Sequence, residues 1–347
     1  MHVLTGDTHR VPAKADWLRS LASWLDSVRD CDGPRMTTTP APHGSPEKLL
    51  RLFPQEDAHL WMPPRGPVSF GLGVLRTFAP SGETRFDAVR DEAARYVRAL
   101  NRNATTTANR HASDNGASGI GAPPIALHGG FSFSIDDDEG PWKPFGDARF
   151  VLPRWTVTWA NGRAAVSLAV DATSAQEYTG AARSKDAILE EASALWRSLT
   201  DDAPIGDPGV TLRSFEQTAE SDWAALVEDI RDEIAGERFE KIVAARRSTA
   251  VCNDTISLDA LMHELGSSYP ECYRFVYRRN GVSFLGATPE RLIRKDGDVL
   301  STEALAGSIG SPERATEDER TALAAELLSS EKDRGEHAIV VEAMRRN

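Results

Sequence analysis

The sequence predicts an α+β fold, in which helices pack against a mainly antiparallel sheet. Two observations predict it. Short apolar runs with alternating polar residues are joined by Asn-Gly and Asp-Gly turns, the strongest local signal for an antiparallel hairpin. Other segments carry apolar residues at helical spacing between capping residues. Because helices are interspersed with hairpins rather than alternating with single strands, a doubly wound parallel sheet is not expected.

Three hairpins are predicted from their turns. Asn161-Gly162 separates expected strands at 155–160 and 164–170, and Asn280-Gly281 separates 272–277 from 282–286. Asp296-Gly297 joins 291–295 to 299–302. A further strand is expected from Lys241 to Ala250, because its residues are mostly apolar and small.

Helices are predicted where apolar residues recur every three to four positions. The clearest ends are Ser221, expected to cap a helix that Gly236 closes, and Thr316 with Glu319, which form a capping-box pattern. The helical segments are 86–100, 175–199, 221–235, 258–265, 316–328 and about 333 to the end.

Three parts are expected along the chain. Residues 1–45 are rich in Pro, Thr, Gly and Asp and predict a flexible leader, apart from a helical pattern at 17–28. Residues 46–210 form the first half of the α+β domain, with a low-complexity insertion at 101–118. Residues 211–347 carry the motifs that suggest chemistry.

Composition excludes several classes of function. The 347 residues include 52 acidic and 40 basic side chains, a net charge of −12, which disfavours nucleic-acid and anionic-membrane partners. The three cysteines have no spacing typical of a zinc site or disulfide framework. No apolar run approaches the roughly 18 residues that span a bilayer, so a cytoplasmic location is expected.

Two residues are candidates for acid–base chemistry. Lys241 opens a predicted strand at the margin of an apolar wall, where desolvation would favour a neutral amine that acts as a base. The alternative is a solvent-exposed lysine at a strand end. Glu290 follows the turn Thr288-Pro289, and burial there would keep it protonated as an acid. The alternative is a loop glutamate paired with Arg291.

Two further positions are candidates for binding a carboxylate and a metal ion. Small residues around Gly307 and Ser308 would let backbone amides point at an anion. A simple turn is the alternative. Glu336 shares a helix face with Val340, so it is directed toward the buried side or its edge. There it needs a counter-charge, which is either a metal ion or a cation such as Lys332 or a nearby arginine.

Taken in order, these blocks resemble the chorismate-utilising enzymes, which include the isochorismate, salicylate, anthranilate and aminodeoxychorismate synthases. The menaquinone-type isochorismate synthases are the most similar group. The blocks that carry the resemblance are Lys-Ile-Val-Ala-Ala-Arg at 241–246, Gly-Ala-Thr-Pro-Glu at 286–290, Leu-Ala-Gly-Ser at 305–308, Ser-Glu-Lys-Asp-Arg at 330–334 and, more weakly, Gly-Gly-Phe-Ser-Phe at 129–133 and Phe-Val-Leu-Pro-Arg at 150–154.

The resemblance implies a role for each candidate. Lys241 would activate the water that adds at C2 of chorismate, and Glu290 would protonate the departing C4 hydroxyl. Gly307 and Ser308 would hold a substrate carboxylate, and Glu336 would be one ligand of a catalytic Mg²⁺.

The resemblance leaves the product open among isochorismate, anthranilate and salicylate. Ala306 stands where aminodeoxychorismate synthases carry a nucleophilic lysine, which favours water or ammonia as nucleophile. Isochorismate synthesis, for menaquinone or a siderophore, is expected and needs no protein partner, whereas anthranilate synthesis would use a glutamine amidotransferase subunit.

The resemblance also implies a longer protein. Enzymes of this family continue past the position where this sequence ends, and the continuation supplies further metal and substrate contacts. The 347-residue chain is therefore expected to be a C-terminal truncation without turnover of its own, and the non-enzyme alternative is a catalytically silent fragment.

Overall fold

The computed structural model describes residues 11–29, 31, 33–106, 125–135, 140–171, 184–312 and 314–346. The chain forms two compact units. Unit 1 comprises Met1–Pro208 and Ser257–Thr288, and unit 2 comprises Gly209–Ile256 and Pro289–Asn347. The sequence predicted parts that follow one another along the chain, whereas unit 1 also includes the later segment Ser257–Thr288. The reason is sheet pairing, because the strand Tyr273–Arg279 (β10) pairs with Ala58–Met62 (β2).

Unit 1 is built on a nine-stranded sheet with the order β11-β10-β2-β3-β6-β7-β1-β4, in which β5 also pairs with β6. Its neighbours are antiparallel except for β1 and β4, which are parallel. The remaining strands are β1 Pro34–Ala41, β3 Val68–Phe78, β4 Ala104–Thr106, β5 His128–Phe131, β6 Ala148–Ala160, β7 Arg163–Asp171 and β11 Val282–Thr288.

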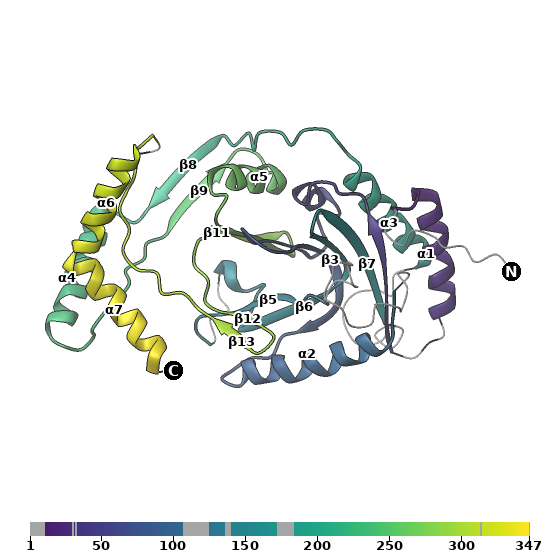
Figure 1. The fold of residues 1–347 in the computed structure, drawn as a ribbon, viewed down its shortest axis with the longest axis horizontal. Helices are drawn as coiled ribbons and strands as arrows, with labels where there is room; N and C mark the ends of the chain where they lie inside the picture. Colours follow the sequence, from purple (N-terminus) through teal and green to yellow (C-terminus); the bar gives the residue numbers. More distant parts are fainter. Residues whose placement is uncertain are drawn as a thin grey trace. The chain divides into compact units, whose positions relative to one another are not determined.

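Helices cover both faces of this sheet. On one face, α1 (Lys14–Val28), α3 (Lys185–Leu199) and α5 (Leu258–Ser268) contribute side chains to the larger core, which includes Trp155 and Phe70. On the other, α2 (Arg85–Arg102) packs over a smaller core around Leu100 and Phe78, as Figure 1 shows along the lower edge of the sheet. Short 3-10 helices lie at Glu47–Arg51 (η1) and Gly140–Trp142 (η2).

The N-terminal segment is not a flexible leader where the structure describes it. Helix α1 buries Trp17, Leu21 and Leu25 in the larger core, and β1 pairs with β7 along its whole length. The burial of these apolar side chains orders the segment despite its polar composition. Residues 1–10 and 107–118 of the predicted leader and insertion lie outside the described residues, while 101–106 complete α2 and form β4.

The predicted hairpin turns are confirmed. Asn161 and Gly162 both have positive φ, as do Asn280 and Gly281, which matches the turn that favours Asn-Gly. Gly73 has another role, since a Cβ there would meet the Arg154 guanidinium at 2.5 Å. The absence of a side chain at Gly73 makes room for the Arg154 guanidinium.

An ion pair is buried between the sheet and α3. The carboxylate of Glu191 accepts hydrogen bonds from Arg154 Nε at 3.0 Å and Nη2 at 2.8 Å, and from the indole of Trp155 at 2.7 Å. Glu191 is 3 % exposed, so removal of its charge would leave the Arg154 guanidinium in the core without its closest counter-charge.

In its described residues, unit 2 contains two pairs of short antiparallel strands and three helices. The strands are β8 Leu212–Gln217 with β9 Ser248–Cys252, and β12 Arg294–Asp296 with β13 Val299–Ser301. The helices are α4 Glu220–Ala235, α6 Glu317–Ser329 and α7 Glu331–Arg346. Thr316 and Glu319 form the predicted capping box.

Two local predictions in unit 2 were wrong. The N-cap of helix α4 is Ala219, two residues before the predicted cap Ser221. The helix begins there because Ala219 already has the extended backbone of an N-cap. The strand expected from Lys241 begins only at Ser248, because β8 pairs with residues 248–252 and offers no partner to 241–247.

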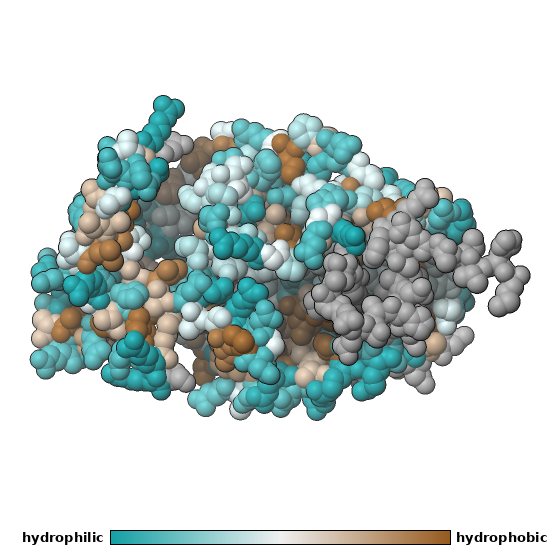
Figure 2. Space-filling model, viewed as in Figure 1, coloured by the Kyte–Doolittle hydropathy of each residue, from teal (hydrophilic) through white to brown (hydrophobic). Residues whose placement is uncertain are grey.

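Unit 2 buries little apolar surface in the part that is described. None of α4, α6 and α7 has a buried residue, and Ala315 is the one buried hydrophobic side chain among the described residues of this unit. Apolar side chains, for example Leu328 on α6, remain on the surface of these helices (Figure 2). The overall class is α+β as predicted, and no described helix is both long and apolar enough to cross a bilayer.

Candidate functional site

All five predicted site residues belong to unit 2. Lys241 lies in the irregular segment between α4 and β9 and is half-buried. The same segment carries Arg246, whose guanidinium lies 5.7 Å from the centre of the Trp223 ring on α4. A cation–π contact of this kind fastens the segment to the helix without burying it.

Glu290 follows β11 by two residues and is exposed, so the burial expected to keep it protonated is not seen. The preceding proline ends the strand because it removes a ladder donor. Its neighbour Arg291 forms an ion pair with Glu303, which ties the start of this segment to the residues just after β13.

The structure brings the third and fourth sequence blocks together. Gly307 has φ of +79°, and a Cβ at this position would lie 2.8 Å from the Asp333 Cβ on α7. Glycine is therefore required twice, by the left-handed backbone and by the close approach of the helix. Ser308 is exposed directly beside this turn.

Glu336 lies one turn further along α7 and is 38 % exposed, with Lys332 Nζ 3.9 Å from its carboxylate. Lys332 is thus in contact with Glu336, and a pair this exposed stabilises the helix by at most about 1 kcal/mol. The described residues hold no group of three His, Cys, Asp or Glu side chains that could bind a metal ion. Glu336 by itself does not make a Mg²⁺ site, since such a site needs further oxygen ligands.

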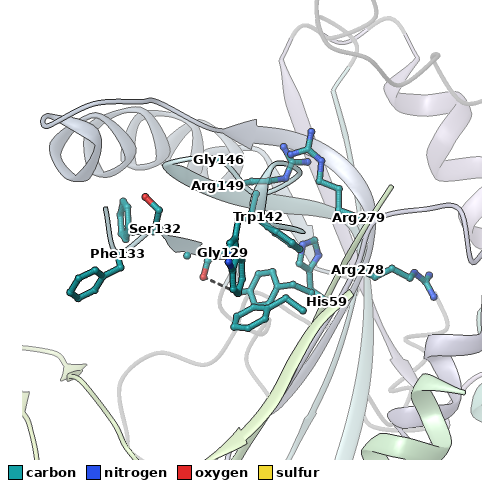
Figure 3. A pocket seen from close by; sticks show the side chains of 14 residues that line it. His59, Gly129, Ser132, Phe133, Trp142, Gly146, Arg149, Arg278 and Arg279 are labelled. Carbon is teal, nitrogen blue, oxygen red and sulfur yellow. Dashed lines mark hydrogen bonds between the residues drawn. The ribbon is translucent and has the colours of Figure 1, made fainter. Parts of the chain in front are cut away.

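A cavity of about 380 Å³ lies in unit 1, where the sequence predicted no site. It is lined by residues of β2, β5, β6, β10 and β11 and by the segment around η2 (Figure 3). The lining residues are His59, Gly129, Gly130, Phe131, Ser132, Phe133, Trp142, Phe145, Gly146, Arg149, Tyr277, Arg278, Arg279 and Phe284.

The polar groups at the base of this cavity are mostly held by one another. The hydroxyl of Tyr277 donates to the Gly129 carbonyl at 2.8 Å, and burial raises the Tyr277 pKa to about 12. His59 lies between the rings of His128 and Tyr277, with centroids 5.6 and 5.1 Å away. Burial lowers the pKa of His59 well below its usual value and that of His128 to about 4, so both rings are neutral at pH 7.

Three arginines line the cavity and have different surroundings. Arg278 donates to the carbonyls of Leu50, Leu52, Phe53 and Glu56, so its guanidinium is part of the fold. Arg149 pairs with Asp57 at 2.9 Å, and Arg279 donates to the Pro144 carbonyl. Burial, with the nearby positive charge of Arg149, lowers the pKa of Arg279, and Figure 3 shows these two guanidinium groups converging at one end of the cavity.

Comparison with known families decides what kind of protein this is. Residues 37–347 match the model of the family described as chorismate binding enzyme. The chain belongs to this family. The match covers both units, including the five predicted site residues in unit 2 and the cavity in unit 1.

Relatives of this chorismate binding enzyme include isochorismate synthases. It is 28 % identical to the isochorismate synthase MenF of Bacillus subtilis over 217 residues, which are 62 % of this chain and 44 % of the relative. It is 33 % identical to the salicylate biosynthesis isochorismate synthase of Pseudomonas aeruginosa over 224 residues, 63 % of this chain and 45 % of the relative. The chain thus spans a little under half the length of these two relatives.

A solved structure shows the same fold. The menaquinone-specific isochorismate synthase MenF of Escherichia coli superimposes with a TM-score of 0.63 and 19 % identity, covering 95 % of this chain and 68 % of that protein. The fold class expected from the sequence is therefore that of a known chorismate binding enzyme.

Sequence reasoning located the motifs of unit 2 and missed the cavity of unit 1. Gly129, Gly130 and Phe131 entered only as part of a resemblance. His59, Arg149 and Arg279 come from strands far apart in the sequence. The one local signal was the pair Arg278-Arg279 before the turn at Asn280, two cations where a strand ends.

Proposed function

We propose that this chain carries the catalytic motifs of an isochorismate synthase, which converts chorismate to isochorismate. The structural observation that supports this most directly is the contact between the Gly307 turn and α7 at Asp333. It joins the turn that carries Gly307 and Ser308 to the helix that carries Glu336, across 26 residues of chain. The relatives named isochorismate synthases support the choice of reaction.

In the proposed reaction, Lys241 takes a proton from water as its oxygen attacks C2 of the chorismate ring. The ring double bonds shift, the C4–O bond breaks, and Glu290 donates a proton to the departing hydroxyl, which leaves as water. One water enters and one leaves, so the product is an isomer of the substrate. Backbone amides at Gly307 and Ser308 hold a substrate carboxylate, since a left-handed glycine turns successive N–H groups toward one point.

Mg²⁺ belongs to this proposal only through Glu336. The described residues do not complete a metal site around it, so no step of the reaction is derived through the ion. We expect the 347-residue chain to bind chorismate and to turn it over slowly or not at all, because the metal ligands present are incomplete. A cytoplasmic location, and menaquinone or siderophore synthesis as the purpose, are parts of the same proposal.

The test measures binding and product on the purified chain. Chorismate is titrated with and without Mg²⁺, and the mixtures are analysed by chromatography after incubation in buffer or in ammonium chloride. Saturable binding that Gly307→Ala weakens at least ten-fold, with isochorismate as the product of any turnover, is the expected result. Gly310→Ala is the matched control, because a Cβ at Gly310 meets no atom within 4 Å.

Two results contradict the proposal. Anthranilate as the sole product in ammonium would assign the chain to a different reaction of the same family. Equal chorismate affinity in the parent chain, Gly307→Ala and Gly310→Ala would remove the binding role of the turn. Where turnover is measurable, Lys241→Gln and Glu290→Gln should each lower kcat at least 100-fold, a typical contribution of a general acid or base, while Lys295→Gln on exposed β12 should not.

A further inference from the structure

The cavity of unit 1 is lined by aromatic side chains that the rest of the unit does not cover. Phe131, Trp142 and Phe284 line it and are 38 %, 44 % and 42 % exposed. Trp142 and Phe284 meet edge to face with centroids 5.2 Å apart, and Phe131 packs on Phe150 at 4.9 Å. Neighbouring rings held in this way form a rigid apolar surface that suits a flat ring. Large aromatic side chains around one hollow are typical of a ligand site.

The charge of the lining is positive. Among the residues that the structure describes, those that line the cavity include Arg149, Arg278 and Arg279, and none of these described residues is an aspartate or glutamate. Arg278 is directed to backbone carbonyls, which leaves two guanidinium groups at one end. Asp57 balances one of them through Arg149. In the described part of the lining one positive charge then remains, and a single anion would neutralise it.

Donors for that anion are available on both arginines. A guanidinium carries five N–H donors. Among the described residues, Arg149 donates to Asp57 and Arg279 to the Pro144 carbonyl, so each keeps N–H groups for another acceptor. Planar pairs of N–H groups match the two oxygens of a carboxylate. The base of the cavity adds no competing charge, since His59 is neutral and the Tyr277 hydroxyl already donates to Gly129.

The size of the cavity limits the ligand further. About 380 Å³ is near the lower end of the range of small-molecule sites, roughly 300–1,000 Å³. A six-membered ring with a carboxylate and one or two small substituents fits this space, whereas a nucleotide does not.

We propose that the cavity formed by β2, β5, β6, β10, β11 and the η2 segment binds a small planar carboxylate. Its ring lies against Phe131, Trp142 and Phe284, and its carboxylate is directed to Arg149 and Arg279. None of Lys241, Glu290 and Gly307 is among the residues that line the cavity, and all three belong to the other unit. The carboxylate site therefore does not depend on the proposed reaction.

The experiment titrates the full chain with three probes by isothermal calorimetry at pH 7. Benzoate has the ring and the charge, benzamide keeps the ring without the charge, and cyclohexanecarboxylate keeps the charge without the flat ring. Benzoate is expected to bind with one site per chain. Benzamide is expected to bind at least ten-fold more weakly, because it cannot form the charge-assisted bonds to the arginines, and cyclohexanecarboxylate several-fold more weakly.

Two variants test the location. Gly130 lines the cavity, and a Cβ there meets no atom within 4 Å, so Gly130→Ile adds a side chain to open space and should abolish benzoate binding. Gly206→Ile is the matched control, with the same open surroundings outside the lining. Arg279→Met should lower benzoate affinity to that of benzamide, and Arg98→Met on the exposed face of α2 should leave it unchanged. Circular dichroism confirms that each variant is folded.

Four outcomes overturn the proposal. Equal affinity for benzoate and benzamide would show that the site does not recognise the anion. Unchanged benzoate binding in Gly130→Ile would show that benzoate binds outside this cavity. Loss of benzoate binding in Lys241→Gln but not in Arg279→Met would place it at the proposed catalytic residues. Absence of saturable binding below about 10 mM, corresponding to a binding free energy near 3 kcal/mol, would also refute a built site.

Discussion

The buried pair of Arg154 and Glu191 makes the stability of unit 1 testable by one substitution. Glu191→Gln keeps the size of the side chain and an acceptor for Trp155 but removes the negative charge. The Arg154 side chain is 11 % exposed and would then rely on Glu56, whose carboxylate is 3.5 Å away and only partly buried. Breaking a buried pair in this way costs about 3–5 kcal/mol, because an uncompensated charge stays in the core.

The expected effect is near the lower end of that range, because Glu56 compensates part of the charge. A loss of about 3 kcal/mol corresponds to a fall of about 1 M in the urea midpoint at the upper end of the slopes of small proteins, roughly 1–3 kcal/mol per M, and to a smaller fall where greater size raises the slope. Urea unfolding is followed by tryptophan fluorescence, to which Trp155 in the same network contributes. Glu190→Gln, an exposed neighbour on α3, is the control and should shift the midpoint little.

A double variant distinguishes a charge effect from general damage. Arg154→Met with Glu191→Leu replaces the pair by apolar side chains and should recover at least half of the loss, because neither charge then remains buried. A loss below 1 kcal/mol in Glu191→Gln, or additive losses in the double variant, would refute the reasoning.

Three further outcomes are expected. Burial lowers the pKa of His59 and lowers that of His128 to about 4, so the unfolded state binds more protons than the folded state below pH 6.5. The free energy of unfolding should therefore fall as the pH is lowered from 6.5 toward 4, by up to about 1.4 kcal/mol per pH unit for each histidine. Thermal unfolding of the chain and of His128→Gln at pH 7, 6 and 5 checks this, and equal slopes for the two would contradict it. Gly307→Ala should destabilise unit 2 by about 1–3 kcal/mol through backbone strain and the contact with Asp333, seen as faster hydrogen exchange in α7 than in Gly310→Ala. In the parent chain, amides of α4, α6 and α7 should exchange much faster than those of β3 and β6, because these helices bury no residue; equal protection would show that unit 2 is stabilised by contacts not considered above.

Local signals in the sequence predicted local structure well. The turns at Asn161-Gly162 and Asn280-Gly281 form as expected, because their left-handed backbone depends on the turn residues themselves. The capping box at Thr316 is likewise made by two residues three positions apart. The family could also be inferred from the short motif blocks, because a resemblance of this kind depends on local sequence alone. The family model matches residues 37–347.

What the sequence could not supply was the pairing between distant segments. Lys241 does not begin a strand, because a strand forms only where a neighbour supplies hydrogen bonds, and β8 pairs further along. The supposed leader is ordered by a core whose other walls come from β6 and α3.

The sequence by itself therefore determined the fold class, the turns, the family and the order of the candidate catalytic residues. The tertiary structure decided that Gly307 meets Asp333 of α7, and that His59, Arg149 and Arg279 surround one cavity. The physical reason is that β10 pairs with β2, which lies more than 200 residues earlier in the chain. The Arg278 guanidinium of β10 also donates hydrogen bonds to carbonyls 222 to 228 residues away. No periodicity within a segment encodes such a pairing, because it depends on which sheet edges and apolar faces remain to be covered once the chain has folded.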